Sequence, residues 1–207
     1  MIKRIIFDID DTLLPFPKEF IDGYKSVLER YNLNIEPSEL YEIIGEYETS
    51  GEYEYYNKEE LLRLINKRLN INLSNDFIDD FFNMYNKLVS KVDDGLVDTL
   101  KYLNGKYELV TLSNWFTDSQ EERLKCAGIL KYFDKVYGTD IVPMKPRKES
   151  YIKAADNRNL SECLMIGDNY DMDIKVPLEL GMNVYQLTNK DTNYPSIKKI
   201  SDLKDVL

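Results

Sequence analysis

The sequence predicts an α/β protein built on a parallel five-stranded sheet, with a helical segment inserted into it. Five short runs of apolar, β-prone residues recur along the chain, and helical patterns separate the later runs. The long stretch between the first two runs carries helical patterns alone. These three observations define the expected fold class.

The five apolar runs are expected to form the strands of the sheet. They are Arg4–Ile9, Glu108–Leu112, Lys135–Tyr137, Cys163–Ile166 and Asn183–Leu187. Helical patterns at Glu149–Arg158 and Ile174–Gly181 separate the last three runs, which is typical of parallel βαβ winding. We therefore expect helices on both faces of the sheet.

Another helix is expected after the second strand. Thr117 is followed three residues later by Gln120, which forms a capping-box pattern, and Gly128 is a typical helix stop. The pattern predicts a helix from Thr117 to Ala127.

The stretch between the first two strands is expected to form a helical insert. We assign residues 15–92 to this insert, and residues 1–14 and 93–207 to the core. One helical face gathers Phe20, Ile21, Tyr24, Val27, Leu28 and Tyr31. Further helices are predicted at Leu40–Ile44, Glu59–Leu69 and Asn75–Val89, with Ser74 as the N-cap of the last.

The composition excludes several kinds of catalytic site. The chain has 207 residues, of which 43% are apolar, none is histidine and two are cysteine. Without histidine, a Ser-His-Asp triad, a Cys-His pair and a histidine-bound zinc ion are impossible, and two cysteines cannot form a four-thiolate site. Acid and base catalysis must therefore come from carboxylates, Lys, Tyr or Cys.

The charge of the chain disfavours polyanionic partners. Its 37 acidic and 27 basic residues give a formal net charge of −10, which repels nucleic acids and anionic membranes. No run of 18 apolar residues occurs, and the first residues turn acidic too early for a signal peptide. We expect a cytoplasmic monomer or homodimer that binds no nucleic acid polymer and no membrane.

Two carboxylates follow the first strand. Asp8 and Asp10 leave its carboxyl end on the same side, where α/β sheets bind ligands, although a polar turn would give the same pattern. A calcium loop is a further alternative, because Asp8, Asp10, Thr12 and Glu19 occupy ligand positions. It is disfavoured, because Leu13 stands where such a loop requires Gly and a strand precedes it.

Polar side chains also follow the second and fourth strands. Ser113 and Asn114 offer a hydroxyl and an amide that could bind phosphate oxygens. Lys145, which a proline follows, could supply the local cation that a phosphate site needs in an acidic protein. Asp168 and Asp173 lead from the fourth strand into a helix. Each segment alone is ordinary loop or cap chemistry.

Together and in this order, the four segments resemble the haloacid dehalogenase superfamily over essentially the full chain. The matching residues are Phe7–Leu13 for the first motif, Ser113 for the second, Lys145 for the third, and Gly167–Asp168 with Asp173 for the fourth. The segments Gln120–Gly128, Tyr132–Asp134 and Lys145-Pro146 resemble the phosphatase branch, which has a Rossmann-like core and a helical cap inserted after the first motif. A joint match is far more specific than any part.

The resemblance implies a Mg²⁺-dependent phosphatase that hydrolyses a small phosphate monoester, such as a nucleotide or sugar phosphate, through an aspartyl-phosphate. Asp8 is then the nucleophile, and Asp10 is the acid and base. The implied Mg²⁺ ligands are the side chains of Asp8 and Asp168 and the backbone carbonyl of Asp10. Asp173 is expected to hold a water molecule of the ion.

The resemblance also assigns the phosphate-binding groups. Ser113, Asn114 and Lys145 are expected to bind phosphoryl oxygens, and Thr12 is expected to orient Asp10. The presence of Asp10 also disfavours dehalogenation, because the dehalogenating members of the superfamily lack this carboxylate.

Three alternatives stay open at this stage. A phosphomutase of the same fold would return the phosphoryl group to a sugar, and the motifs do not exclude it. A non-catalytic regulatory or binding protein of this fold would typically lack one of the catalytic carboxylates, all of which are present here. A two-component receiver domain also combines acidic residues with Lys around Mg²⁺, but its phosphorylated Asp follows a middle strand.

Two features could set substrate choice. Trp115 stands where similar phosphatases carry a small residue, so it either narrows the pocket, stacks on a flat substrate or packs against protein. Tyr53, Tyr55 and Tyr56 lie in a Tyr- and Glu-rich segment of the insert. They either contact the non-phosphate part of the substrate or pack locally in a loop between helices.

Overall fold

The chain consists of two compact units in the computed structural model, which describes residues 1–16, 20–87, 92 and 94–207. One unit comprises Met1–Phe16 with Ser90–Leu207, and the other comprises Pro17–Val89. We refer to them as the sheet unit and the helical unit. Within the described residues, no helix has the length and apolarity needed to cross a membrane.

The sheet unit is built on a parallel sheet of six strands, in the order β3-β2-β1-β4-β5-β6. The strands are β1 (Arg4–Phe7), β2 (Glu108–Leu112), β3 (Lys135–Tyr137), β4 (Cys163–Gly167), β5 (Asn183–Leu187) and β6 (Ser196–Ile197). The prediction of five strands is wrong, because the sheet has a sixth strand, β6, that was not predicted. This strand has two residues and follows a proline, so it carries no alternating pattern from which it could be recognised.

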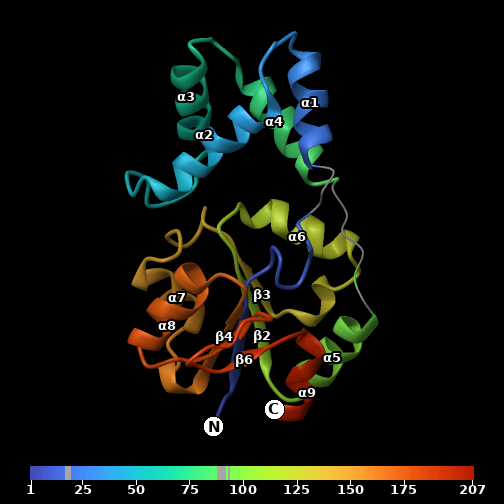
Figure 1. Cartoon of the computed structure of the whole chain (residues 1–207), viewed down its shortest axis with the longest axis vertical. Helices are drawn as coiled ribbons and strands as arrows, with labels where there is room; N and C mark the ends of the chain where they lie inside the picture. Colours follow the sequence, from blue (N-terminus) through green and yellow to red (C-terminus); the bar gives the residue numbers. More distant parts are fainter. Residues whose placement is uncertain (17–19, 88–91, 93) are drawn as a thin grey trace. The chain divides into compact units, whose positions relative to one another are not determined.

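Alternate residues of each strand enter two hydrophobic cores, one on each face of the sheet. In β1, Ile5 and Phe7 belong to one core, whereas Ile6 belongs to the other. Helix α5 (Asp94–Asn104) and helix α9 (Leu203–Val206) cover the first core, and α7 (Lys148–Ala155) and α8 (Lys175–Glu179) cover the second. Figure 1 shows these two layers of helices on either side of the strands.

Helix α6 (Thr117–Cys126) differs from its prediction in how it begins. Phe116 occupies the N-cap position, and the expected capping box does not form. The backbone N–H and hydroxyl of Thr117 both donate to Asp140 Oδ1 at 2.7 Å, and Gln120 turns into the protein. A tertiary partner has therefore replaced the local cap.

Short helical turns complete the sheet unit. They are η1 (Leu130–Tyr132), η2 (Leu160–Glu162), the π-helical turn η3 (Tyr170–Ile174) and η4 (Ile200–Asp202). The predicted helix Ile174–Gly181 is thus divided between η3 and the shorter α8, and helix α5 was not among the predicted helices.

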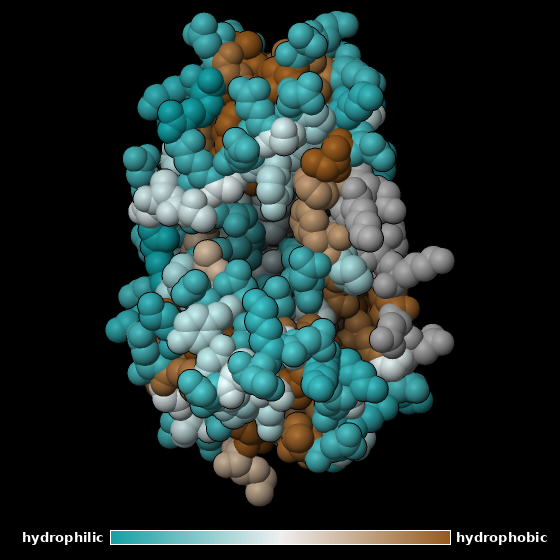
Figure 2. Space-filling view, viewed as in Figure 1, coloured by the Kyte–Doolittle hydropathy of each residue, from teal (hydrophilic) through white to brown (hydrophobic). Residues whose placement is uncertain are grey.

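The helical unit contains α1 (Phe20–Arg30), α2 (Pro37–Thr49), α3 (Lys58–Leu69) and α4 (Asn75–Tyr85). Helix α1 packs against α2 and α4, and α3 packs against α2 and α4. The rings of Tyr24 and Phe81 meet edge to face at 5.0 Å between centroids. In Figure 2, the visible surface of this unit is mostly hydrophilic, with hydrophobic side chains between its helices.

Capping explains some boundaries of these helices. The side chain of Asn57 accepts hydrogen bonds from the amides of Glu59 and Glu60, so it fixes the start of α3. Ser74 occupies the predicted N-cap position of α4, but its side chain makes no capping bond. Helix α2 is longer than predicted and includes the start of the Tyr- and Glu-rich segment. Helix α4 ends at Tyr85, earlier than the predicted helix Asn75–Val89, and residues 88 and 89 of that prediction lie outside the described residues.

Candidate active site

The sheet register brings the sequence motifs to one edge. Phe7 at the end of β1 pairs with Thr111 of β2 on one side and Ile166 of β4 on the other. The amide of Asp8 donates to the carbonyl of Ile166 at 2.8 Å. The residues that follow these three parallel strands therefore meet at the carboxyl edge of the sheet, which is the ligand-binding edge of open α/β folds.

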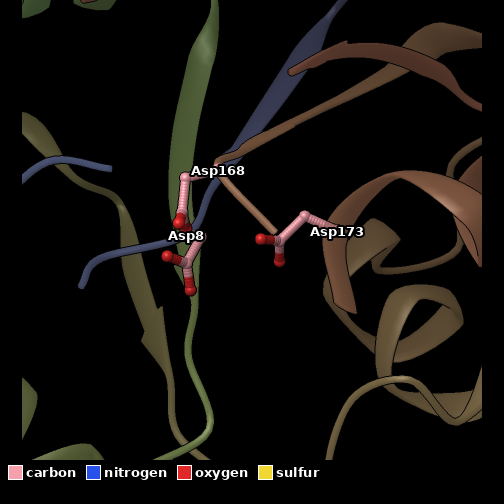
Figure 3. Close-up of side chains that lie close together, drawn as sticks. All are labelled: Asp8, Asp168 and Asp173. Atoms are coloured by element: carbon pink, nitrogen blue, oxygen red, sulfur yellow. The ribbon is translucent and has the colours of Figure 1, made fainter. Parts of the chain in front are cut away.

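Three aspartates form a carboxylate cluster at this edge. Asp8, Asp168 and Asp173 each offer an oxygen atom, and these atoms lie within 4.8 Å of one another. Figure 3 shows the three side chains close together, with those of Asp168 and Asp173 directed toward Asp8. They come from the end of β1, from the end of β4 and from η3. Asp173 is 1% exposed, so a helical turn delivers this carboxylate into the interior. We refer to these residues as the aspartate cluster.

Lys145 joins the aspartate cluster from the loop before α7. Its ammonium lies 2.7 Å from Asp8 Oδ1 and 2.6 Å from Asp173 Oδ1, and the side chain is 3% exposed. Asn114 holds this lysine, because its amide nitrogen donates to the carbonyl of Lys145 at 3.0 Å and its oxygen accepts from the amide of Lys145 at 2.7 Å. Asn114 was predicted to bind phosphate, whereas the structure places its side chain on the Lys145 backbone.

Thr12 makes hydrogen bonds to the aspartate cluster, whereas it was predicted to orient Asp10. Its hydroxyl donates to Asp8 Oδ2 at 3.1 Å and accepts from the amide of Asp168 at 3.1 Å. The predicted contact with Asp10 is thus replaced by a bridge between the β1 and β4 loops. Thr12 fixes two carboxylates of the cluster relative to each other.

Gly167 is required by the close approach of Asp173. A Cβ atom at this position would lie 2.3 Å from the carboxylate of Asp173, far inside the contact distance of two heavy atoms. The absence of a side chain at the end of β4 therefore lets η3 place its carboxylate in the cluster.

Asp10 lies outside the carboxylate cluster and has different partners. Its Oδ1 forms an ion pair with Nη2 of Arg123 at 2.7 Å, and its Oδ2 accepts from Nε2 of Gln120 at 3.0 Å. Arg123 was not among the predicted site residues, and Gln120 was predicted to cap α6. The signal was present, since both residues occupy core-facing positions of α6, where apolar residues are usual.

Ser113 lies next to this second group. Its side chain is 3% exposed, and its hydroxyl accepts a hydrogen bond from Nε2 of Gln120 at 2.7 Å. The hydroxyl therefore sits beside both Gln120 and the site of Asp10, at the end of β2 where the sequence placed it.

Burial and charge shift the protonation of these groups. Burial raises the pKa of Asp173, and the neighbouring carboxylates of Asp8 and Asp168 add to this rise, while Lys145 opposes it. Burial also raises the pKa of Asp168. Burial alone would lower the pKa of Lys145, but the carboxylates of Asp173 and Asp8 outweigh it and raise the pKa above the usual value. The lysine is therefore a fixed cation.

The pKa of Asp10 is raised as well. Burial is the largest cause, and the charge of Asp8 adds to it, whereas Arg123 and Gln120 favour the carboxylate. A carboxyl group of this kind holds a proton more readily than a carboxyl group in water.

The aspartate cluster fits a divalent cation. Three carboxylates around one ammonium leave two negative charges in excess when all are ionised. All the available ligand atoms are oxygens, which are preferred by hard cations such as Mg²⁺ and Ca²⁺. The sequence predicted Asp8 and Asp168 in this group, and the structure adds the carboxylate of Asp173. The Asp10 side chain is not part of it, and the role of the Asp10 carbonyl stays a prediction.

Two of the four residues predicted to select the substrate, Trp115 and Tyr56, are buried within the protein. Trp115 is 5% exposed, and its indole N–H donates to the hydroxyl of Ser119 at 3.1 Å. In the helical unit, the rings of Tyr53 and Tyr56 both stack on Tyr47, at 3.9 Å and 5.0 Å between centroids. Tyr56 is 3% exposed and donates to Glu48. Only Tyr53 and Tyr55 are partly exposed.

The sheet unit thus combines a parallel α/β sheet with a cluster of three aspartates at the ligand-binding edge of the sheet. A family model described as haloacid dehalogenase-like hydrolase matches residues 2–181. The chain belongs to this family, as its motifs predicted.

Three known proteins illustrate what the chain is similar to in sequence or in fold. Pyrimidine 5′-nucleotidase YjjG from Escherichia coli (strain K12) is 29% identical over 92 residues, which are 42% of this chain and 41% of that protein. The alignment thus spans less than half the length of this relative.

Two solved structures match over nearly their full lengths. HAD-hydrolase YfnB from Bacillus subtilis, bound to magnesium, has a TM-score of 0.78 at 19% identity, covering 100% of this chain and 98% of that chain. L-2-haloacid dehalogenase from Xanthobacter autotrophicus has a TM-score of 0.72 at 17% identity, with the same coverage. At such identities the similarity shows the fold alone. The two similar structures are named as a hydrolase and a dehalogenase, so the fold does not specify the reaction.

Proposed function

We propose that this protein is a Mg²⁺-dependent phosphatase that hydrolyses a small phosphate monoester through a phosphorylated Asp8. The observation that carries the proposal is the pair of carboxylates after β1, each with its own cation. Asp8 lies against Lys145, and Asp10 lies against Arg123. One carboxylate is thus arranged as an anion for attack, and the other has a raised pKa and can donate a proton.

In the first half of the reaction, a carboxylate oxygen of Asp8 attacks phosphorus. A bond forms between that oxygen and phosphorus, while the bond to the leaving oxygen breaks. The carboxyl group of Asp10 gives its proton to the leaving oxygen, so the product departs as an alcohol. Lys145 reduces the repulsion between Asp8 and the dianionic phosphoryl group.

In the second half, water attacks phosphorus of the aspartyl-phosphate. Asp10, now a carboxylate, takes a proton from this water, and the bond between phosphorus and Asp8 breaks. Inorganic phosphate leaves, and both aspartates return to their starting states. The hydroxyl of Ser113, which accepts a hydrogen bond from Gln120, would donate to a phosphoryl oxygen in both halves.

Magnesium is the proposed cofactor. Asp8, Asp168 and Asp173 would hold the ion, which neutralises charge on the transferring phosphoryl group when bound. The excess negative charge of the aspartate cluster and its oxygen-only ligands support this assignment.

Asp10 favours phosphoryl transfer over dehalogenation. A halide is a weak base and leaves without a proton, so a carboxyl group with a raised pKa would have no task in that step. An alkoxide is a strong base and needs a proton as it leaves. The partners of Asp10 therefore support a phosphate ester as substrate.

The helical unit is proposed to act as a cap that sets substrate choice. In the sequence, the helical unit begins at Pro17, nine residues after Asp8. Tyr53 and Tyr55 are its partly exposed members of the Tyr- and Glu-rich segment. We expect single replacements of Tyr53 and Tyr55 by Phe and by Ala to change the ranking of natural substrates while leaving a minimal aryl phosphate nearly unaffected. An unchanged ranking in all these variants would assign the two rings to packing.

The proposal is tested by phosphate release from a panel of nucleoside monophosphates, sugar phosphates and aryl phosphates, with and without MgCl₂. The name of the relative YjjG makes pyrimidine nucleotides the first group to try. Acid-quenched protein should carry phosphate on Asp8, and Asp8→Asn should carry none. If the wild-type protein releases no phosphate from any member of the panel, the proposal is wrong. Release that depends on a sugar bisphosphate would indicate a phosphomutase instead.

A further inference from the structure

Two polar residues of α6 are buried without an obvious structural reason. Gln120 is 0% exposed and Arg123 is 1% exposed, although Asp118, Glu121 and Lys125 of the same helix are exposed. A spacing of three places Gln120 and Arg123 on one helical face. Burial of a guanidinium is unfavourable unless a partner compensates the lost hydration. The partner found here is the carboxylate of Asp10.

The side chains of Asp10, Gln120 and Arg123 all contact one another. Nη2 of Arg123 lies 2.7 Å from one oxygen of Asp10, and Nε2 of Gln120 lies 3.0 Å from the other. Nη1 of Arg123 donates to Oε1 of Gln120 at 2.8 Å. This last bond fixes the amide orientation, because the oxygen must face the guanidinium and the NH₂ group must face Asp10. The same NH₂ group donates to Ser113.

The contacts hold Asp10 from the inside of the protein. The side chain of Asp10 is 26% exposed, whereas that of Arg123 is 1% exposed. Asp10 stands in a turn after β1, next to Asp11 with a φ of 58°, so the strand itself does not fix its side chain. Two contacts, one on each oxygen, restrict rotation of the carboxyl group and leave its outer side open to a substrate.

We propose that Arg123 and Gln120 are positioning residues, which hold the carboxyl group of Asp10 in the orientation that its proton transfers require. This inference rests on the proposed phosphatase function. The alternative is that both residues only stabilise α6 against the core, in which case their loss would affect every substrate alike. The two readings are separated by how strongly the leaving group needs a proton.

The test compares an alkyl phosphate, such as glycerol phosphate, with nitrophenyl phosphate, whose leaving group departs without a proton. Arg123→Met keeps the apolar stem and removes the ion pair. It should lower kcat/KM for the alkyl ester about 10- to 100-fold, and for the aryl ester several-fold at most. Gln120→Leu should also lower kcat/KM more for the alkyl ester than for the aryl ester, but by a smaller factor. Arg123→Lys should retain part of the alkyl-ester activity that Arg123→Met loses. Lys125→Met, on the exposed face of α6, is the matched control.

A double-variant comparison tells whether Arg123 acts through Asp10. In an Asp10→Asn background, Arg123→Met should add little further loss, because the group that it positions is already gone. Equal losses for the two esters, or an undiminished effect in the Asp10→Asn background, would overturn the inference. Fluorescence of Trp115 checks that each variant is folded.

Failure of the proposed function would look different. In that case the wild-type protein would release no phosphate from either ester. An active wild-type enzyme whose Asp10→Asn variant selects between the esters, but whose Arg123 variants do not, would refute the positioning role alone.

Discussion

Replacement of Lys145 by methionine is the most direct test of the charge arrangement. The ammonium of Lys145 is buried and bonded to both Asp8 and Asp173, at 2.7 Å and 2.6 Å. Methionine fills a similar space without charge, so Lys145→Met leaves the two carboxylates without this cation. Removal of one partner from a buried ion pair costs about 3–5 kcal/mol, because the remaining charge is desolvated and uncompensated.

The loss of folding stability in Lys145→Met should depend on pH and on magnesium. Burial and the neighbouring carboxylates raise the pKa of Asp173, and Lys145→Met removes the cation that opposes this rise. The native variant therefore binds more protons than its unfolded chain. Its stability therefore improves as pH falls, and the deficit relative to wild type should be largest at about pH 8 and smaller near pH 5. Mg²⁺ should reduce the deficit at high pH, because a divalent cation at the aspartate cluster replaces the lost charge.

The assay is urea unfolding followed by fluorescence of Trp115, which is the single tryptophan of the chain and is buried in the same unit as Lys145. With a denaturant slope of about 2 kcal/mol/M, the expected loss lowers the midpoint by about 1.5–2.5 M in magnesium-free buffer. Lys148→Met, an exposed lysine close in sequence, should change stability by at most about 0.5 kcal/mol. A Lys145→Met midpoint equal to that of wild type at high pH, without magnesium, would refute the electrostatic reasoning.

Three further predictions follow from the site and its surroundings. Asp10→Asn should reduce kcat/KM about 10²- to 10⁴-fold for alkyl phosphates and much less for aryl phosphates, and equal losses would contradict the role of Asp10 as proton donor. Saturating Mg²⁺ should raise the unfolding temperature of the wild type by roughly 5–10 °C, because binding to the folded state alone stabilises it by about 2.7 kcal/mol. Asp168→Asn should largely abolish this rise. An undiminished rise in the variant would place the ion elsewhere. Gly138→Ala should destabilise the sheet unit by about 1–3 kcal/mol, because the new Cβ would lie 2.3 Å from the backbone nitrogen of Thr117. In Gly45→Ala, the new Cβ in α2 would meet no atom within 4 Å, so this variant should stabilise the helical unit by about 0.5–1 kcal/mol. Thermal unfolding measures both changes.

Local sequence patterns identified most of the elements that build the fold. The runs that form β1 to β5 are short, apolar and bounded by polar residues, so burial alone distinguishes them. The helical insert was recognisable because its apolar residues recur at helical spacing and no strand pattern interrupts them. Boundaries were less accurate, as α2 shows, because the end of a helix depends on weak local contacts.

Two errors came from tertiary contacts that override local preference. Thr117 and Gln120 have the spacing of a capping box, yet each finds a stronger partner far along the chain, in Asp140 and Asp10 respectively. In the same way, Thr12 binds Asp8 and the loop after β4 instead of its neighbour Asp10. A pattern that is satisfied locally in principle is abandoned when folding offers a better hydrogen bond.

Residue types and their local spacing were enough to predict the fold class, the four motif segments, the exclusion of histidine chemistry and the excess of acidic charge, because these properties can be read along the chain. Which side chains meet depends on the tertiary structure. It placed Asp173 in the aspartate cluster, Asn114 on the backbone of Lys145, and Arg123 against Asp10. Asp173 and Arg123 each lie more than a hundred residues from their partners Asp8 and Asp10 in the sequence. The parallel register of β1, β2 and β4 brings these segments together, and no local pattern specifies that register.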